Sequence, residues 1–365
     1  MRHIISVLLL FSFFSCHKKE YNEKELLKAF LNHSYYSYSE TDIKNAMKRG
    51  MSGIKAIDKN FEIIPLKGKR VKKVEKNNKA EFFYPFILKK HGNNYLIVKV
   101  FDYSIAFEAG LKNGVLNSIN SKNIDMLDPY VLEKEIENSE ELSISFNDGK
   151  GDWNMKLKKE LKSFPFVWSL ALDENSAYVN LLSISKNSAE YFKNNITNIS
   201  RRGIKNLIID LRGVSGGNYD DAAIITGYFS KDKKSYSIKS SKKGYNKEFI
   251  ITENPFTNFN LIVLTDGETK LLGEIMAQTL KENGAVIVGE KTGADIYITK
   301  LFKVGNNSAA NITVAKLYPP SQKDMDDGLI PDYTVSFSEY RKFAVRYVID
   351  SDPVIAKAME LLGIN

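Results

Sequence analysis

The stretch that decides the fold is Leu261–Asp295, which reads LIVLTDGETKLLGEIMAQTLKENGAVIVGEKTGAD. Its opening run, Leu261–Leu264, has the length and the branched residues typical of a buried strand, and an Asp-Gly turn ends it. From Gly273 onward apolar residues recur at helical spacing as far as Gly284, and a second apolar run follows at Ala285–Val288. The stretch therefore predicts a strand, a helix and a second strand, joined by a right-handed crossover.

The same alternation continues on the N-terminal side. A strand is expected at residues 177–182, a helix follows it, and Leu207–Asp210 has the unbroken apolar character of a strand buried in a parallel sheet. Alternating strands and helices predict an α/β core. The apolar face expected for the intervening helix consists of Ala189, Phe192, Ile196 and Ile199.

Four motifs of this core resemble those of the tail-specific, or C-terminal processing, serine peptidases. Residues 210–217, DLRGVSGG, resemble the family's Asp-Leu-Arg-x-Asn-x-Gly-Gly element. Residues 273–277, GEIMA, and residues 288–293, VGEKTG, resemble the elements that carry its catalytic serine and lysine, and residues 328–332, GLIPD, resemble its Gly-Ile-x-Pro-Asp element. The resemblance spans about residues 85–362 and implies an α/β, α+β multidomain protein with a βαβ peptidase core.

Two positions depart from the chemistry that this resemblance implies. The family's nucleophilic serine falls on Leu271, and its lysine base falls on Asp295. A leucine side chain has no lone pair with which to attack a carbonyl, and an ionised carboxylate does not replace a neutral lysine as the base. Because losing the nucleophile leaves only the slow rate that backbone donors supply, we expect negligible cleavage.

The resemblance also implies a binding site built from backbone amides. In the family, an amide of the glycine pair and the amide after the serine form the oxyanion hole, and these fall on Gly216 or Gly217 and on Leu272. Together with Gly273 they make up the expected peptide-binding site. Glycine suits this role because a substrate can approach its backbone closely, and a backbone amide persists whatever side chain accompanies it.

A displaced nucleophile would keep the protein an active serine-type endopeptidase. Thr269 is the fallback candidate, two residues before the family position, and Ser215 and Thr292 also carry hydroxyls nearby. Lys270 and Lys291 are the amines that would serve as a base if they were desolvated. Such a displacement swings a hydroxyl away from the oxyanion donors, and angstrom errors in this geometry are costly, so we favour the inactive interpretation.

Composition argues against several other classes of protein. The chain has 365 residues and a formal charge of +8, but no nucleic-acid recognition motif accompanies the charge, so we expect no nucleic-acid partner. One cysteine and four scattered histidines predict neither a metal site nor a cofactor. The motif Gly213-x-Ser-x-Gly217 fits the nucleophile elbow of an α/β-hydrolase. That fold places its catalytic histidine after the serine, whereas all four histidines of this chain precede the motif.

The first residues resemble an export signal. A charged start at residues 1–3 precedes an apolar run at 4–14 that is too short to cross a bilayer as a helix. Cys16, the single cysteine, ends a segment, FFSC, that resembles the lipobox of bacterial lipoproteins. We therefore expect an exported lipoprotein, acylated at Cys16 and anchored to the membrane on the periplasmic or cell-surface side of a bacterial envelope.

The expected division of the chain has five parts. One of them is PDZ-like, because residues 109–114, AGLKNG, resemble a PDZ element and alternating apolar residues predict a hairpin at 142–157. A PDZ domain binds an extended peptide as an added strand. The parts are a lipoprotein signal at 1–16, a helical region with a basic linker at 17–80, the PDZ-like domain at 81–162, the peptidase-like core at 163–345 and a C-terminal helix at 346–365.

These observations favour one function over two others. The favoured hypothesis is an exported pseudopeptidase that binds polypeptide segments or C-termini without cutting them. The alternatives are an active serine-type endopeptidase acting through Thr269, and an envelope scaffold that holds a partner with its PDZ-like domain.

Overall fold

Contacts between residues divide the chain into two compact units. The expected signal with Cys16 and the basic stretch at 67–79 lie outside the described residues. Within the described ranges, no helix is long and apolar enough to cross a membrane. The units are Met1–Asn77 with Thr299–Val314, and Asn78–Ile298 with Ala315–Asn365. The computed structural model describes residues 21–66, 84–101, 104–159, 167–231, 234–251, 255–336, 349 and 352–364.

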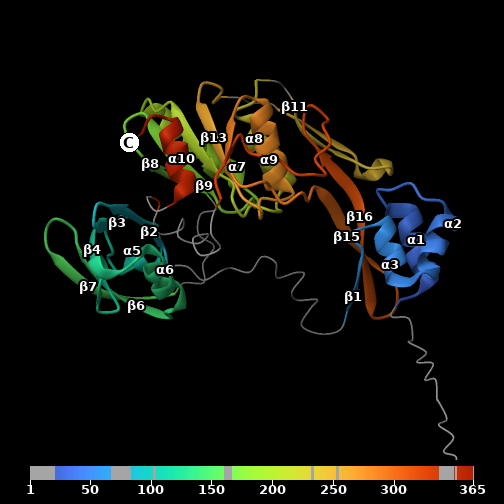
Figure 1. Ribbon diagram of the computed structural model, residues 1–365, viewed down its shortest axis with the longest axis horizontal. Helices are drawn as coiled ribbons and strands as arrows, with labels where there is room; N and C mark the ends of the chain where they lie inside the picture. The colour runs from blue at the N-terminus through green and yellow to red at the C-terminus, as the bar shows by residue number, and fades with distance from the viewer. Residues whose placement is uncertain are drawn as a thin grey trace, which may run out of the picture. The chain divides into compact units, whose positions relative to one another are not determined.

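The first unit packs three short helices against a β-hairpin (Figure 1). Its elements are α1 (Glu23–His33), α2 (Glu40–Lys48), α3 (Gly50–Ile57), β1 (Glu62–Pro65) and parts of β15 (Tyr297–Lys303) and β16 (Ser308–Tyr318). Asn22 and Ser39 accept hydrogen bonds from first-turn amides, so these polar residues fix where α1 and α2 begin. Leu26, Phe30 and Ile312 lie in the shared apolar core, which joins the helices to the hairpin.

The long strand β16 pairs with different partners at its two ends. Its first residues pair with β1 and its last residues with β11 (Lys234–Lys239), both in antiparallel fashion. Contacts group Thr299–Val314 with the N-terminal helices, and the expected peptidase-like core at 163–345 stays a prediction. The grouping follows from packing, because Ala310 and Ile312 of this strand lie among the apolar residues of the helices.

The second unit contains the six-stranded sheet that carries the candidate site (Figure 1). Its strands are β8 (Val167–Ala171), β9 (Ser176–Leu181), β10 (Asn206–Asp210), β13 (Asn260–Thr265), β14 (Val286–Gly289) and β17 (Tyr333–Thr334). They lie in the order β17-β14-β13-β10-β9-β8, and all neighbours are parallel except β8 and β9. The stretch Leu261–Asp295 forms β13, α9 and β14 as predicted, and the α/β class is confirmed.

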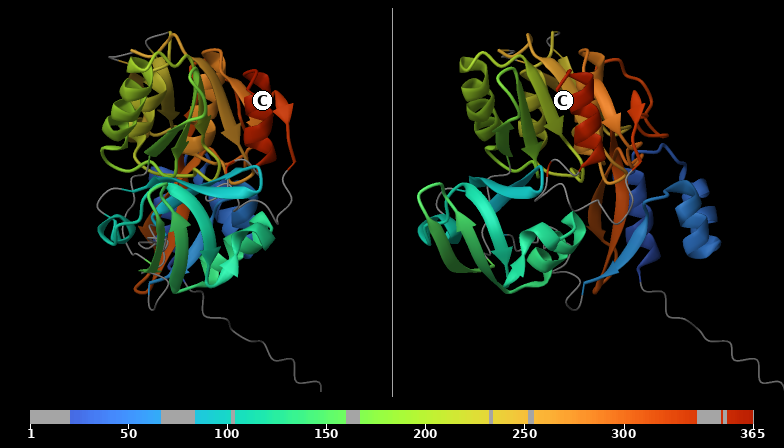
Figure 2. Two further views of the ribbon diagram at one scale, coloured as in Figure 1. Left: turned by 90° about the vertical axis from the view of Figure 1, so that its left-hand side faces the viewer. Right: turned by 60° about the vertical axis from the view of Figure 1, so that its left-hand side comes forward.

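Helices cover both faces of this sheet. They are α7 (Ser188–Arg201), α8 (Tyr219–Gly227), α9 (Leu272–Glu282) and α10 (Pro353–Leu361). Val354 and Ile355 of α10, red in Figure 2, pack on one face with Tyr178 and Ile208. Right-handed crossovers between parallel neighbours place α7, α8 and α9 on the other face. The loops that follow β10, β13 and β14 therefore meet at one edge, where α/β proteins build their sites.

Residues 86–158 form a second, antiparallel sheet in the order β2-β3-β4-β6-β7, with β5 beside β4. The predicted hairpin is present, because β6 and β7 pair from Glu141 with Lys158 to Asn147 with Asp152. The sheet and helix α6 bury an apolar core of their own. Peptide binding by this domain stays a prediction. The elements are β2 (Phe86–His91), β3 (Asn94–Val100), α5 (Ile105–Glu108), β4 (Gly114–Ile119), β5 (Lys122–Asn123), α6 (Pro129–Asn138), β6 (Glu141–Asn147) and β7 (Asp152–Lys158).

The first unit depends on one buried carboxylate, that of Asp58. It accepts hydrogen bonds from the amide and the hydroxyl of Thr313, both at 2.8 Å, and from the amide of Asn60 at 3.1 Å. Replacing Asp58 with alanine leaves these donors unsatisfied, so Asp58→Ala is expected to lower the free energy of unfolding by about 3 kcal/mol. Chemical denaturation measures the loss. Glu62→Ala, an exposed position on β1, is the control and is expected to change the value by less than about 0.5 kcal/mol; equal losses contradict the account.

Candidate functional site

The turn between β13 and α9 holds Leu271 in a strained backbone conformation. Its φ of 45° and ψ of −107° are rarely adopted by residues with a Cβ, at a cost on the order of 1–3 kcal/mol. Two hydrogen bonds hold the turn: the Leu271 amide donates to the Asp295 carbonyl at 2.6 Å, and the Lys270 amide donates to the Val214 carbonyl at 2.9 Å. The turn at which the sequence resemblance placed a serine is thus sharply shaped, and Leu271 gives it a half-buried hydrocarbon side chain.

The amide of Leu272, one of the expected oxyanion donors, is already occupied. It donates to the Ser215 carbonyl at 2.7 Å. The Gly273 amide likewise donates to the Lys270 carbonyl at 2.9 Å. Both amides are therefore engaged within the turn, because a motif fixes which residue carries an amide but not what that amide bonds.

The glycines of the site are required by close packing. A Cβ on Gly217, whose φ is 138°, would lie 2.0 Å from the Ile184 carbonyl oxygen. A Cβ on Gly273 would lie 2.2 Å from the Val214 carbonyl oxygen. At Gly216 the nearest atom to such a Cβ is Cδ2 of Leu271, at 3.9 Å, so the leucine side chain lies over this glycine. Gly216 and the side chain of Leu271 thus lie close together.

A buried polar cluster behind the turn holds the segment that contains Asp295. Glu274, fully buried in the first turn of α9, accepts from the Thr292 hydroxyl at 2.7 Å and from the Asp295 amide at 3.1 Å. The Thr292 hydroxyl in turn accepts from the Leu329 amide at 2.7 Å. Burial raises the pKa of Glu274, and the nearby charge of Asp295 acts in the same direction, against the lowering effect of the hydrogen bonds. Sequence motifs contained all of these residues, but their mutual contacts were not predicted.

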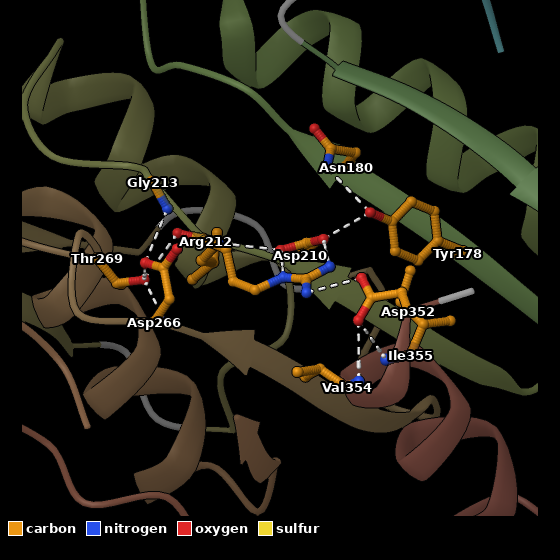
Figure 3. A network of polar contacts seen from close by, with 11 residues as sticks. Tyr178, Asn180, Asp210, Arg212, Gly213, Asp266, Thr269, Asp352, Val354 and Ile355 are labelled. Carbon is orange, nitrogen blue, oxygen red and sulfur yellow. Dashed lines mark hydrogen bonds and ion pairs between the residues drawn. The ribbon is translucent and has the colours of Figure 1, made fainter. Parts of the chain in front are cut away.

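Thr269, the fallback nucleophile, is fully buried and used for structure. Its hydroxyl lies 3.1 Å from the Leu211 carbonyl and 3.0 Å from a carboxylate oxygen of Asp266, and it accepts from the Asp266 amide at 3.0 Å (Figure 3). Asp266 also accepts from the Gly213 amide at 3.0 Å, so the pair ties the β10 loop to the β13 turn. This geometry gives no support to the alternative in which Thr269 attacks a substrate.

The remaining candidate groups do not form a catalytic pair. The hydroxyl of Thr292 is bonded to Glu274, whereas Ser215 is exposed. Lys270 pairs with Glu268 at 3.0 Å, and Lys291 is exposed. Within the part of the chain that the structure describes, neither lysine hydrogen-bonds to a hydroxyl of this turn. The same part contains no group of three or more His, Cys, Asp or Glu side chains arranged to hold a metal ion.

A buried charged network lies beneath the site and was missed by the sequence analysis (Figure 3). Arg212 donates to both carboxylate oxygens of Asp210, at 2.9 and 2.6 Å, and Asp210 also accepts from the Tyr178 hydroxyl at 2.6 Å. Nη1 of Arg212 lies 2.8 Å from a carboxylate oxygen of Asp352, an ion pair without hydrogen-bond alignment. Asp352 caps α10 through the Val354 amide, so the network ties the last helix to the end of β10. The Asp-Pro cap was visible in the sequence, but its partner lies 140 residues away and gave no signal.

Two glycine-to-alanine substitutions test the close packing at the turn. Gly273→Ala drives a Cβ into the Val214 carbonyl and is expected to lower the free energy of unfolding by about 3 kcal/mol. Gly267→Ala, in the same turn, places its Cβ where nothing lies within 4 Å and is expected to change stability by less than about 1 kcal/mol. Urea denaturation of both variants checks the expectation. If Gly273→Ala were as stable as Gly267→Ala, the described turn geometry would be wrong.

The raised pKa of Glu274 predicts how the stability of the folded chain changes with pH. A carboxyl group with a raised folded pKa binds its proton more tightly in the folded chain, so its contribution to stability is complete below the unfolded pKa and is lost as pH rises through the folded pKa. The stability of the wild type relative to Glu274→Gln is therefore expected to fall as pH rises above the ordinary value of 4.5. Denaturation at a series of pH values measures this, with Glu268→Gln as the reference for losing an exposed carboxylate. If the stability of the wild type relative to Glu274→Gln stays constant or grows as pH rises, the prediction is contradicted.

Comparison with known proteins identifies the core. Residues 175–335 match the model of peptidase family S41. A carboxyl-terminal-processing protease of Picosynechococcus is 28% identical over 164 residues, which are 44% of this chain and 39% of the relative. Carboxy-terminal processing protease CtpA of Bacillus subtilis is 26% identical over 198 residues, 53% of this chain and 42% of the relative. The matched stretch thus spans about two fifths of these relatives' length.

Solved structures show the same fold at low sequence identity. A photosystem II D1 C-terminal processing protease has a TM-score of 0.52 at 15% identity, covering 86% of this chain and 92% of its own. A putative S41 protease from Bacteroides fragilis has a TM-score of 0.53 at 17% identity, covering 93% and 97%. Residues 175–335 therefore match the peptidase family S41 domain, and the chain has the fold of the C-terminal processing proteases.

Proposed function

We propose that the protein is a pseudopeptidase, which binds polypeptide segments and does not cut them. The family is one of proteases, so polypeptide is the class of ligand that the domain is built to meet. On this proposal, the chain retains the ability to bind polypeptide and lacks the ability to cleave it.

The observation that carries the proposal is the side chain at the strained turn. Leu271 has the sharp strand-to-helix geometry that presents a nucleophile, but its side chain holds no atom able to attack a carbonyl. The Leu272 amide adds a second obstacle, because it donates to Ser215 and cannot stabilise an oxyanion until that bond breaks. Loss of the nucleophile alone typically costs on the order of 10⁶-fold in a serine hydrolase.

The active-endopeptidase alternative finds no support in the geometry of its candidate. The Thr269 hydroxyl is fully buried and surrounded by structural partners, so reaching a substrate would require the turn to unfold. The second alternative, an envelope scaffold, differs in where the ligand binds. A scaffold that acts through the antiparallel domain would bind equally well after a charge is placed at Leu271, whereas a peptide site at the turn would not.

The location of the protein is part of the proposal and rests on sequence alone. The charged and apolar start and the FFSC segment support export and acylation at Cys16. A lipid anchor would hold the chain at the envelope surface, where it would meet unfolded or processed polypeptide ends.

Labelling with a serine-reactive fluorophosphonate tests the absence of a nucleophile. The purified chain is expected to remain unlabelled and to leave unfolded polypeptide substrates intact, while an active S41 peptidase is labelled in parallel as the positive control. Labelling that is lost in the near-isosteric variant Thr269→Val but kept in Leu271→Ala would contradict the proposal. Binding is measured in the same preparation with fluorescently labelled unfolded protein, and weaker binding by Leu271→Asp would place the ligand at the turn.

A further inference from the structure

The backbone around Asp295 is fixed on both sides. Its carbonyl accepts from the Leu271 amide at 2.6 Å, and its amide donates to the buried Glu274 at 3.1 Å. The next residue, Ile296, is fully buried, and its carbonyl accepts from the Leu317 amide at 3.0 Å. The residue that corresponds to the family base is therefore held in place, and it adjoins the Leu271 turn directly.

The carboxylate of Asp295 projects from this fixed backbone into solvent. The residue is exposed, and its carboxylate makes no hydrogen bond or ion pair with any residue that the structure describes. By contrast, Lys270 in the adjoining turn is already paired with Glu268. Lys291 is exposed on the same loop and is also left without an ion-pair partner among the described residues. A fixed and unpaired carboxylate is available to a ligand at lower entropic cost than one on a mobile segment.

The turn that is hydrogen-bonded to the Asp295 backbone carries an apolar side chain, that of Leu271. Its side chain is half-buried over Gly216, and its backbone is hydrogen-bonded to that of Asp295. An apolar surface beside a carboxylate complements a lysine or arginine side chain, which combines an aliphatic stem with a cationic head. A terminal carboxylate of a polypeptide fits less well, because both Asp295 and the buried Glu274 would repel it.

Resting on the proposed function, we infer that the Leu271–Asp295 pair selects internal polypeptide segments that carry a lysine or arginine side chain over this turn. Asp295 is a specificity-determining residue of the binding site. The position that supplies a base in the peptidases now supplies a counter-charge to the ligand.

The test uses the full chain and two kinds of probe. Fluorescently labelled, reduced and carboxymethylated α-lactalbumin reports whether unfolded polypeptide binds at all. Short unlabelled peptides, amidated at the C-terminus and differing only in lysine, norleucine or glutamate at one central position, then compete for the site. Norleucine keeps the four-carbon aliphatic stem of lysine and lacks the ammonium group, so the comparison isolates the cation.

The lysine peptide is expected to compete about two- to fivefold more strongly than the norleucine peptide, the range of an exposed ion pair. Asp295→Asn is expected to remove this difference, and Asp295→Lys to favour the glutamate peptide. Glu248→Gln, an exposed carboxylate on the strand Lys247–Ile250, is the control and should keep the wild-type preference.

Equal competition by the lysine and norleucine peptides, no competition by either, or a lysine preference that survives in Asp295→Asn would overturn the inference while leaving the proposed function standing. Failure of the wild type to bind unfolded α-lactalbumin would overturn both.

Discussion

The hydrogen bond from the Leu271 amide to the Asp295 carbonyl, 2.6 Å long, is the contact on which the candidate site depends. It joins the turn that would present a nucleophile to the loop that would present a base. Together with the bonds to Val214 and Ser215 it holds Leu271 at a φ of 45°. At about 1 kcal/mol each, these bonds together offset a strain on the order of 1–3 kcal/mol.

Buried polar groups extend this constraint through the core. Glu274 and Thr292 fix the loop of Asp295 from behind, and Arg212 with Asp210 and Asp352 fixes the end of β10 and the start of α10. Removing one partner of such a network leaves a charge or a donor buried alone, which costs several kcal/mol. Buried polar contacts therefore hold the backbone of the candidate site in place without using the side chains of Leu271 and Asp295.

Much of this arrangement was predictable from the sequence, for identifiable reasons. The spacing of apolar residues in Leu261–Val288 predicted β13, α9 and β14, because local apolar patterning dictates local structure. The motifs also placed Leu271 and Asp295 at one site, and the structure brings their backbones into contact. Three features were not predictable, because each depends on contacts between distant segments. The Leu272 amide is taken by Ser215, Thr269 is buried against Leu211, and Asp352 pairs with Arg212. The grouping of Thr299–Val314 with the N-terminal helices likewise depends on packing that no local pattern records.

Native mass spectrometry of the chain with an unfolded polypeptide, followed over prolonged incubation, tests the central claim most directly. It reports the bound ligand, any covalent adduct and any product in one spectrum. The account predicts a non-covalent complex whose polypeptide keeps its full mass. Cleavage products that accumulate in proportion to the protein, or an acyl adduct on the chain, would contradict it.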